Sequence, residues 1–378
     1  MRSPRKPDSP DGTPVSVITG FLGSGKTTLL NRLLQRSDMA DAAVIINEFG
    51  EIGLDHLLIA TPSENTVLLS NGCLCCTVRG DLVATLADLY ARRGGGKIPH
   101  FAKVLVETTG LADPAPILQT VMTDPELVPA FRLDAVVTLV DGVNGAQQLD
   151  HHPESVKQAA VADRLVVTKP DLAGPDTIEA LRHRLASINP GAQVFTAVHG
   201  EIGPESLFGA GLDDFARHGD ARRWLREDAF SAGAAADHHH HDHRHDDAPD
   251  VNRHDDHIRA FCVYYDRPIS ATGLAVWLDT LAALRGANLL RVKGLLNVGG
   301  DPVAVHVVQT LVHEPKALAR WPDDDRRSRL VFITRDMARA EVERTLGALA
   351  LPDVPPGPGR TIDPRAYAQF VEAMKSFR

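Results

Sequence analysis

The sequence predicts an α/β domain with a mostly parallel sheet, followed by a smaller α+β domain. From residue 14 to about residue 200, short apolar runs alternate with amphipathic helical stretches. Several runs are nearly continuous in Val, Ile and Leu, which is typical of strands buried on both faces of a parallel sheet. After residue 257 strands follow one another more closely, which favours a second domain of α+β type.

Composition excludes several classes of protein. The chain has 378 residues, of which 43% are hydrophobic, enough for two ordinary domains. Its net charge of −9 argues against nucleic acid as the main partner, because binding the phosphate backbone requires a basic face. No run approaches the ~20 apolar residues that cross a bilayer. The charged, Pro-rich start is not a secretory signal, so we expect a cytoplasmic protein with no membrane partner.

Seven strands are expected in the first domain, with amphipathic helices between them such as 81–92 and 175–187. The expected strands are residues 15–19, 43–47, 67–69, 104–107, 135–140, 165–168 and 194–197. Helices should cover this open sheet on its faces. Ligands in such sheets bind at the carboxyl ends of the strands, so the segments that follow these strands are the ones to search for chemistry.

The segment 20–28 reads Gly-Phe-Leu-Gly-Ser-Gly-Lys-Thr-Thr and lies between a predicted strand and a predicted helix, 27–34. This is the context that a P-loop requires. Its glycines let backbone N–H groups surround phosphate oxygens, and the helix N-terminus adds partial positive charge. We expect Lys26 to reach the β- and γ-phosphates and the Thr27 hydroxyl to bind Mg²⁺. The expected nucleotide-binding residues of the loop are Gly20, Gly23, Ser24, Gly25, Lys26, Thr27 and Thr28.

The apolar strand 103–108 ends in Glu107-Thr108-Thr109-Gly110. An acid at a strand end, followed shortly by glycine, suits coordination of Mg²⁺ and contact with a γ-phosphate. We therefore expect Glu107 to act with Lys26 in catalysis and with Thr27 at magnesium. The alternative is an ordinary strand end followed by a turn.

A second strand leads directly into Thr168-Lys169-Pro170-Asp171. An Asp in this place can accept hydrogen bonds from N1 and N2 of guanine, and Lys169 can lie across the base. GTPases usually carry Asn where this chain has Thr168, so the preference for guanine depends mainly on Asp171. The alternative is a surface turn.

Three of the four cysteines, Cys73, Cys75 and Cys76, lie within four residues, between a strand and an amphipathic helix. Such close neighbours are poor candidates for disulfides, and a reducing compartment fits them. Thiolates are soft ligands for Zn²⁺, Cu⁺ or Co²⁺, and an adjacent helix N-terminus lowers thiol pKa. Three thiols leave a fourth metal position for an exchangeable ligand. The alternatives are buried small side chains or a redox cluster. Cys262, in a later strand, is expected in the core.

Residues 237–257, the His/Asp tract, contain eight His and seven Asp. This composition cannot form a core and predicts a solvated linker. Its imidazoles suit Zn²⁺, Ni²⁺, Cu²⁺ or Co²⁺ and can raise the local metal concentration. The candidate accessory ligands are His238, His239, His240, His241, His243 and His245. The alternative is a spacer with incidental metal affinity.

Beyond the tract the sequence predicts a βαβββα order. The expected strands are 258–265, 289–298, 304–312 and 330–334, and the expected helices are 270–284 and 337–349. The expected division of the chain is a disordered lead-in at 1–13, a P-loop domain at 14–222, a linker at 223–257, an α+β domain at 258–350 and a Pro/Gly-rich tail with a short helix at 351–378.

Five segments together resemble the CobW-like GTPases, which are relatives of the hydrogenase and urease nickel-insertion GTPases. These segments are residues 20–28, 47–55, 72–76, 107–110 and 168–171. In the C-terminal domain, 290–294 and 329–333 resemble strands characteristic of the same family. The resemblance implies a metallochaperone that binds GTP, Mg²⁺ and a transition metal, and that releases the metal to a client metalloprotein on hydrolysis.

The resemblance also assigns residues. It implies that Cys73, Cys75 and Cys76 form the metal motif, and that 47–55 is a switch loop. Within that loop Glu48, Glu51 or Asp55 would touch Mg²⁺ or the second metal, and we assign Glu48 to magnesium. Slow intrinsic hydrolysis is expected, because the sequence offers no obvious arginine finger in cis.

The leading hypothesis is a GTP-dependent chaperone for Zn²⁺. One alternative changes the metal to Co²⁺ for cobalamin synthesis or Fe²⁺ for a nitrile hydratase-type client. Another is an ATP-dependent small-molecule kinase with a structural zinc, against which Asp171 argues. A third is a metal buffer or sensor without significant hydrolysis. A nucleotide- or metal-dependent dimer is left open.

Overall fold

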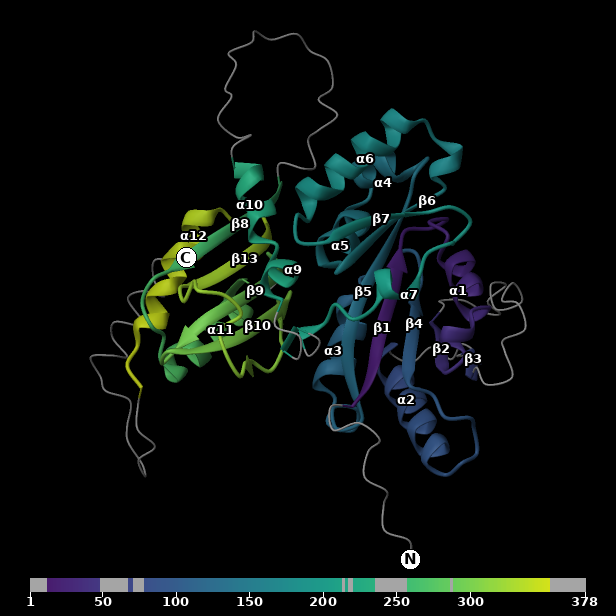
Figure 1. Ribbon diagram of the computed structural model, residues 1–378, viewed down its shortest axis with the longest axis horizontal. Helices are drawn as coiled ribbons and strands as arrows, with labels where there is room; N and C mark the ends of the chain where they lie inside the picture. The colour runs from purple at the N-terminus through teal and green to yellow at the C-terminus, as the bar shows by residue number, and fades with distance from the viewer. Residues whose placement is uncertain are drawn as a thin grey trace, which may run out of the picture.

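The chain folds around two β-sheets, one parallel and one antiparallel (Figure 1). One has seven strands and the other has six. This computed structural model describes residues 12–47, 67–70, 78–212, 215–216, 220–234, 257–285 and 288–353. No helix within these ranges is both long enough and apolar enough to span a bilayer.

The first sheet has the strand order β3-β2-β4-β1-β5-β6-β7, and every pair of neighbours is parallel. Its strands are β1 Thr13–Gly20, β2 Ala42–Asn47, β3 Val67–Ser70, β4 Lys103–Thr108, β5 Phe131–Asp141, β6 Arg164–Thr168 and β7 Gln193–Ala197. All seven predicted strands are confirmed, as is the parallel α/β class. The largest difference is at β5, which begins at Phe131 rather than at residue 135. Two polar residues, Arg132 and Asp134, interrupt its apolar run, so the sequence pattern did not indicate this first part of the strand.

Helices cover both faces of this sheet, as alternating strand residues require. On one face α1 packs against residues such as Val137 and Leu139, together with Leu207 of α7. On the other face Val136 packs with α2 and α3, while Val140 packs with α5 and α6. The helices are α1 Lys26–Leu34, α2 Val78–Gly94, α3 Ala115–Thr123, α4 Gly145–His151, α5 Pro153–Val161, α6 Pro175–Ile188 and α7 Pro204–Leu207, with 3-10 turns η1 Ser37–Met39 and η3 Pro170–Leu172.

The C-terminal sheet is antiparallel, with the order β11-β10-β9-β13-β8 and β12 paired to β10. Its elements are β8 Ile258–Tyr265, α11 Ala271–Arg285, β9 Leu289–Val298, β10 Asp301–Val308, β11 Leu311–Val312, β12 Lys316–Ala317, β13 Ser328–Arg335, α12 Arg339–Thr345 and the 3-10 turn η6 Leu346–Ala350. Trp277 of α11 is fully buried against one face of this sheet. The opposite face packs toward α5, α9 and α10. The predicted α+β class of this domain is confirmed.

Three details of the sequence prediction are wrong. The single strand 304–312 is two strands, because the chain turns at Gln309 and Thr310 and β11 pairs back on β10. The helix 337–349 begins at Arg339 and finishes as a 3-10 turn. Part of the expected linker is helical: α9 is Ala221–Leu225 and α10 is Glu227–Ala234. The side chains of Trp224 and Phe230 explain why this segment is helical, because both are buried in the core.

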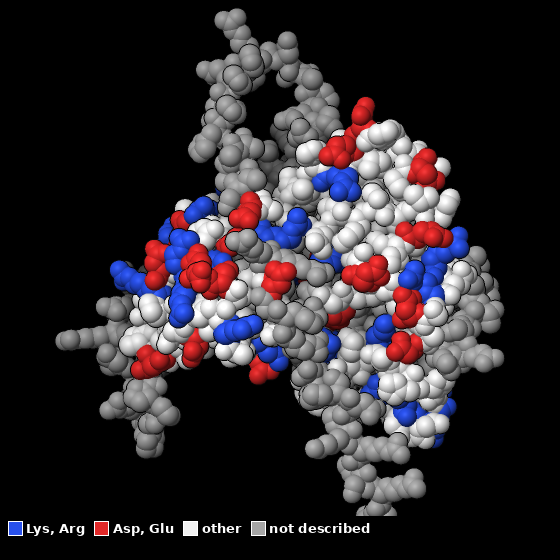
Figure 2. Space-filling view, in the orientation of Figure 1, with Lys and Arg blue, Asp and Glu red and all other residues white. Residues whose placement is uncertain are grey.

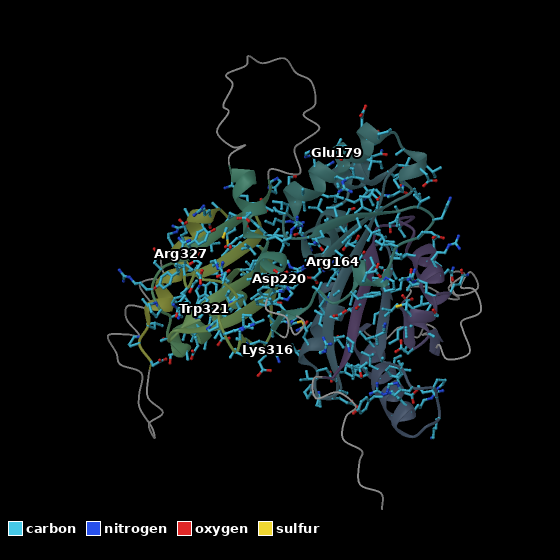
Figure 3. All side chains as sticks on the ribbon, in the orientation of Figure 1. Arg164, Glu179, Asp220, Lys316, Trp321 and Arg327 are labelled. Carbon is cyan, nitrogen blue, oxygen red and sulfur yellow. The ribbon has the colours of Figure 1, made fainter. Side chains whose placement is uncertain are left out.

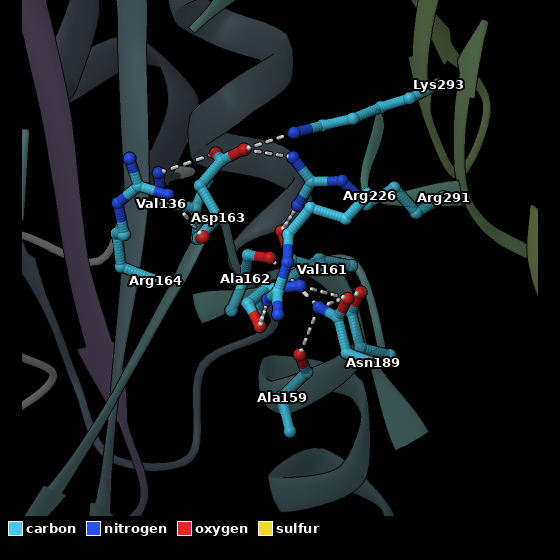
Figure 4. Close-up of polar contacts among 12 residues, drawn as sticks. Val136, Ala159, Val161, Ala162, Asp163, Arg164, Asn189, Arg226, Arg291 and Lys293 are labelled. Atoms are coloured by element: carbon cyan, nitrogen blue, oxygen red, sulfur yellow. Dashed lines mark hydrogen bonds and ion pairs between the residues drawn. The ribbon is translucent and has the colours of Figure 1, made fainter. Parts of the chain in front are cut away.

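The two domains meet at a buried charged contact (Figure 4). Asp163, which follows α5, pairs with Arg291 and with Lys293 of β9, the latter at 3.1 Å. Its other oxygen accepts the Val136 N–H at 3.0 Å. Although burial alone would raise the pKa of Asp163, the charges of Arg291 and Lys293 hold it below its ordinary value. Arg164, at the start of β6, lies at the same boundary (Figure 3).

Charge on the outer surface is mixed. The face drawn in Figure 2 shows acidic and basic side chains interspersed over both domains rather than gathered by sign.

Candidate functional site

The loop between β1 and α1 is shaped by its glycines. Gly23 and Gly25 adopt left-handed backbone with φ of 75° and 90°, conformations that other residues rarely adopt. A Cβ on Gly20 would lie 2.4 Å from a backbone oxygen of β5, so no side chain fits there. The Ser24 N–H donates to the Phe21 carbonyl at 3.1 Å and closes the loop. The loop therefore wraps closely around the start of α1, where the first backbone N–H groups of a helix have no partner within the helix itself.

Three of the predicted residues meet at this loop. Lys26 Nζ donates to the carbonyls of Gly20 at 2.9 Å and Phe21 at 3.2 Å, so the ammonium lies across the loop. Thr27 Oγ1 lies 3.4 Å from Oε1 of Glu107, which is buried at the end of the neighbouring strand β4. Oxygen ligands of this kind are the ones that Mg²⁺ prefers. Thr28, by contrast, is exposed in the first turn of α1.

The segment after β4 is held against the phosphate loop. The Thr108 and Thr19 hydroxyls share a buried hydrogen bond of 2.7 Å. A Cβ on Gly110 would lie 2.7 Å from the backbone nitrogen of Leu22, so Gly110 rests directly on the loop. From the other side, Gln158 of α5 donates to the Gly110 carbonyl at 3.2 Å. Sequence reasoning missed Gln158, because a polar residue within a helix belongs to no motif.

The loop after β6 is tied to the phosphate loop by two side chains. The buried Thr168 hydroxyl lies 2.8 Å from the Ser24 carbonyl, to which it donates. Lys169, with a left-handed φ of 53°, donates from Nζ to the Gly23 carbonyl at 2.8 Å and to Asp141 Oδ2 at 2.7 Å. Thr168 thus uses its hydroxyl to join two loops, a contact that explains a threonine at this position.

Asp141 is a site residue that sequence reasoning missed. It is the last residue of β5 and its carboxylate is buried. The N–H groups of Val143 at 2.8 Å and Asn144 at 3.2 Å donate to Oδ1. Although burial alone would raise the pKa of Asp141, the hydrogen bonds from Lys169 and these N–H groups lower it below its ordinary value. The sequence pattern could have indicated Asp141, because Asp141 lies at the end of an apolar strand, as Glu107 does.

The side chain of Asp171 lies at the outer edge of the site. Its Oδ2 is 3.9 Å from Nε2 of His199, in the loop after β7. His199 has a φ of 50°, and Arg32 of α1 donates to its carbonyl at 3.3 Å. No sequence pattern singles out His199. Asp171 and His199 therefore approach each other from the loops that follow β6 and β7.

Several predicted residues lie outside the described residues. These are Glu48, Glu51 and Asp55 of the expected switch loop, the thiols Cys73, Cys75 and Cys76, and His238, His239, His240, His241, His243 and His245. Within the part of the chain that the structure describes, no group of three or more His, Cys, Asp and Glu side chains is placed to hold a metal ion. Cys262 is buried in the core as predicted, and burial raises the pKa of its thiol to about 11.

Comparison with known proteins matches both domains. Residues 14–196 match the family described as "CobW/HypB/UreG, nucleotide-binding domain", and residues 258–350 match "Cobalamin synthesis protein cobW C-terminal domain". The chain is 32% identical over 337 residues to the zinc chaperone YjiA of Escherichia coli (strain K12), which covers 89% of this chain and 98% of that one. It is 29% identical over 372 residues to the zinc chaperone CobW of Sinorhizobium sp, covering 89% and 97%.

A solved structure extends the likeness to three dimensions. The crystal structure of Zn(II)-bound YjiA GTPase from E. coli has a TM-score of 0.64 and 28% sequence identity. The match covers 90% of this chain and 99% of that one. Sequence and structure therefore agree over nearly the whole length of the relative, and the chain belongs to the CobW/HypB/UreG family of nucleotide-binding proteins.

Proposed function

We propose that this chain is a GTP-dependent metallochaperone. It hydrolyses GTP to GDP and phosphate, binds Zn²⁺ at Cys73, Cys75 and Cys76, and delivers the metal to a client metalloprotein. The observation that carries the nucleotide part is the meeting of Lys26, Thr27 and Glu107 at the loop between β1 and α1. The names of the relatives, zinc chaperones and a GTPase, support both parts of the proposal.

The phosphate loop explains how the triphosphate is held. Backbone N–H groups at the start of α1 and the Lys26 ammonium bind the β- and γ-phosphates. Thr27 and Glu107 bring together the oxygen donors that fit Mg²⁺, and their 3.4 Å separation supports this assignment. When bound, Mg²⁺ neutralises charge on the phosphates. Lys26 stabilises the negative charge of the transferring group, and Gly110, which packs directly on Leu22 of the loop, would offer its N–H to the γ-phosphate.

The base site favours guanine. The Asp171 carboxylate accepts from N1 and N2 of guanine, and adenine offers no matching pair of donors. Lys169 is fixed by Asp141, with its aliphatic stem available to lie across the base. Thr168 holds the base loop in register with the phosphate loop instead of contacting the base through an amide.

The proposed metal site is supported by the position of the three thiols in the sequence. Strand β3 ends at Ser70 on the carboxyl edge of the sheet, and the three thiols follow directly in the sequence. Three thiolates hold Zn²⁺ and leave one position for an exchangeable ligand, which suits transfer rather than permanent storage. Nucleotide state controls affinity if the γ-phosphate orders the switch loop 47–55 and hydrolysis releases it. The His/Asp tract supplies further imidazole ligands, and a reducing cytoplasm keeps the thiols available.

A comparison of thiol variants tests this function. Wild-type protein should bind one Zn²⁺ per chain tightly through the three thiols, with weaker binding by the His/Asp tract, and should turn over GTP. The variant with Cys73, Cys75 and Cys76 all changed to Ser should lose tight Zn²⁺ binding and keep GTP binding. Cys262→Ser is the matched control, because it removes a thiol from the core without touching the motif. Tight binding by the triple variant would contradict the metal assignment, and absent GTP turnover would favour a buffer or sensor. Competition with Co²⁺ and Fe²⁺ decides between the metals.

A further inference from the structure

Asp113 is the point where three parts of the chain converge. It lies three residues after Gly110, and its Oδ1 accepts the Ala115 N–H at 3.0 Å at the start of α3. Lys157 of α5 lies 3.5 Å from Oδ2. Gln309 of the C-terminal domain donates from Nε2 to both carboxylate oxygens, at 3.3 and 3.4 Å. One carboxylate thus joins the segment after β4, helix α5 and the second domain.

The same segment is held a second time by α5. Gln158, which is almost completely buried, donates from Nε2 to the carbonyls of Gly110 at 3.2 Å and Ala112 at 3.0 Å. Its own backbone carbonyl accepts the Thr138 hydroxyl of β5 at 2.8 Å, which fixes this part of the helix on the sheet. Segment 110–113 is therefore fixed between the phosphate loop on one side and α5 on the other.

Helix α5 is in turn anchored to the C-terminal domain. Arg291 donates to the carbonyl of Val161, the last residue of α5, and also pairs with Asp163 just beyond it (Figure 4). Asn189 closes the same helix end by donating to the carbonyls of Ala159, Ala160 and Ala162. The C-terminal domain therefore contacts segment 110–113 directly through Gln309 and indirectly through α5.

The side chain of Gln309 is presented by a tight turn. Gln309 and Thr310 alone separate β10 from β11, which pair immediately on either side of the turn. Gln309 has a left-handed φ of 53°, and its N–H donates to the Leu290 carbonyl of β9 at 3.2 Å. A non-glycine residue in this conformation is held there by its surroundings and is a reason to look for a role.

We propose that Gln309 and Gln158 are positioning residues for GTP hydrolysis. Through Asp113 and the Gly110 carbonyl they hold segment 110–113 against the phosphate loop, so that the Gly110 N–H faces the γ-phosphate. The inference rests on the proposed GTP hydrolysis. A movement of the C-terminal domain then alters the γ-phosphate side of the site and leaves the base side unchanged, because in the described part of the chain Lys169 contacts Gly23 and Asp141, and Asp171 approaches His199, rather than Gln309, Gln158 or Asp113. Changes at Gln309 or Gln158 should therefore alter the affinity for GTP and leave the affinity for GDP unchanged.

Variants of Gln309 test this through charge. Gln309→Glu places a second carboxylate beside Asp113, and we expect kcat for GTP hydrolysis to fall about tenfold, because the repulsion replaces a hydrogen bond. Gln309→Ala should lower kcat about threefold. Gln309→Lys should keep activity near the wild-type level, because its ammonium can pair with Asp113. In all three the affinity for GDP stays constant, while the affinity for a non-hydrolysable GTP analogue follows kcat.

Thr310→Ala is the matched control, since Thr310 is the exposed neighbour in the same turn. Gln158→Leu removes the second contact at similar volume and should lower kcat more than Gln309→Ala; thermal unfolding shows whether it is folded. If Gln309→Glu is folded and matches wild type in kcat and in the ratio of analogue to GDP affinity, the positioning role is wrong. If the wild type itself does not hydrolyse GTP, the proposed function fails, whereas the affinity ratio still tests the positioning of segment 110–113.

Discussion

The Thr168 hydroxyl donates a hydrogen bond of 2.8 Å to the carbonyl of Ser24 and so joins the loop after β6, which we propose meets the base, to the loop between β1 and α1, which we propose meets the phosphates. Ser24 itself is fully buried, which leaves this contact shielded from water. The two halves of the proposed nucleotide site are therefore connected, and a change at Thr168 should affect the binding of base and phosphate together.

Thr168→Val keeps the shape of the side chain and removes the hydroxyl. We expect the affinities for GTP and GDP to fall equally, by about three- to tenfold, because one buried carbonyl loses its donor. Thr120→Val is the matched control, since Thr120 is also buried and donates to a backbone carbonyl, that of Pro116 in α3. Calorimetric titration with both nucleotides makes the measurement. Unchanged affinity in Thr168→Val would show that the contact has no role in binding.

Glu107→Gln removes one negative charge where Thr27 and Glu107 meet. We expect the Mg²⁺ concentration for half-maximal hydrolysis to rise by at least about tenfold, because a neutral amide is a poorer partner for a divalent cation. GTP turnover at saturating Mg²⁺ should fall by roughly a hundredfold. The measurement is phosphate release across a Mg²⁺ titration. Glu126→Gln, an exposed carboxylate before β5, serves as the control, and equal Mg²⁺ dependence in both variants would contradict the assignment.

Asp171→Asn should change which base is preferred. The amide presents one donor and one acceptor where the carboxylate presented two acceptors. We therefore expect the affinity for GTP to fall by at least about tenfold. The affinity for XTP should rise, because xanthine carries a carbonyl in place of the guanine amino group. Asp176→Asn, an exposed residue in the first turn of α6, is the control. Competition of GTP, XTP and ATP against a fluorescent nucleotide measures the preference. Continued strong preference for GTP would contradict the role of Asp171.

The interdomain contact should make stability depend on pH. Burial, followed by the charge of Arg291, lowers the pKa of Lys293 from its ordinary 10.5 to about 7. Between these values the unfolded chain binds the proton and the folded chain does not, so this residue makes the free energy of unfolding rise as the pH rises from about 7 to about 10.5. Asp163, whose pKa is lowered, is ionised in both states over this range and adds no slope.

Lys293→Met tests that dependence. The variant should lack the rise, so the stability of wild type relative to Lys293→Met increases between pH 7 and pH 9. Near pH 7 the variant should be at least as stable as wild type, because an apolar side chain avoids the cost of burying a charge. Urea unfolding at both pH values measures the free energy of unfolding of each protein. The control is Lys97→Met, a substitution at an exposed lysine. A pH-independent difference between wild type and Lys293→Met would show that Lys293 does not titrate in this range.

Local sequence predicted the sheet and the phosphate loop well, for physical reasons. Strands buried on both faces need long apolar runs, and the glycines at positions 20, 23 and 25 are required by close approach or left-handed backbone. Glu107 was singled out as a candidate because it lies at the end of such a run. Asp141 follows another, and was missed only because its predicted strand ended one residue early.

Residues that act across the fold were not predictable. Gln158 and Gln309 are ordinary polar residues in sequence, and their contacts exist only because α5 and the C-terminal domain dock beside segment 110–113. The turn at Gln309 was hidden because apolar residues flank it on both sides, so the run looked like one strand. His199 likewise approaches Asp171 from a different strand end. The roles of Glu48 and of the three thiols stay predictions.

The central claim is that nucleotide state controls the metal site, and the Zn²⁺ affinity of the wild-type protein tests it most directly. The dissociation constant should be measured by competition with a chelating dye, in the presence of Mg²⁺ with GDP and with a non-hydrolysable GTP analogue. We predict that the two constants differ by at least about tenfold, and that the difference disappears when Cys73, Cys75 and Cys76 are changed to Ser. The same Zn²⁺ affinity with both nucleotides would contradict the account.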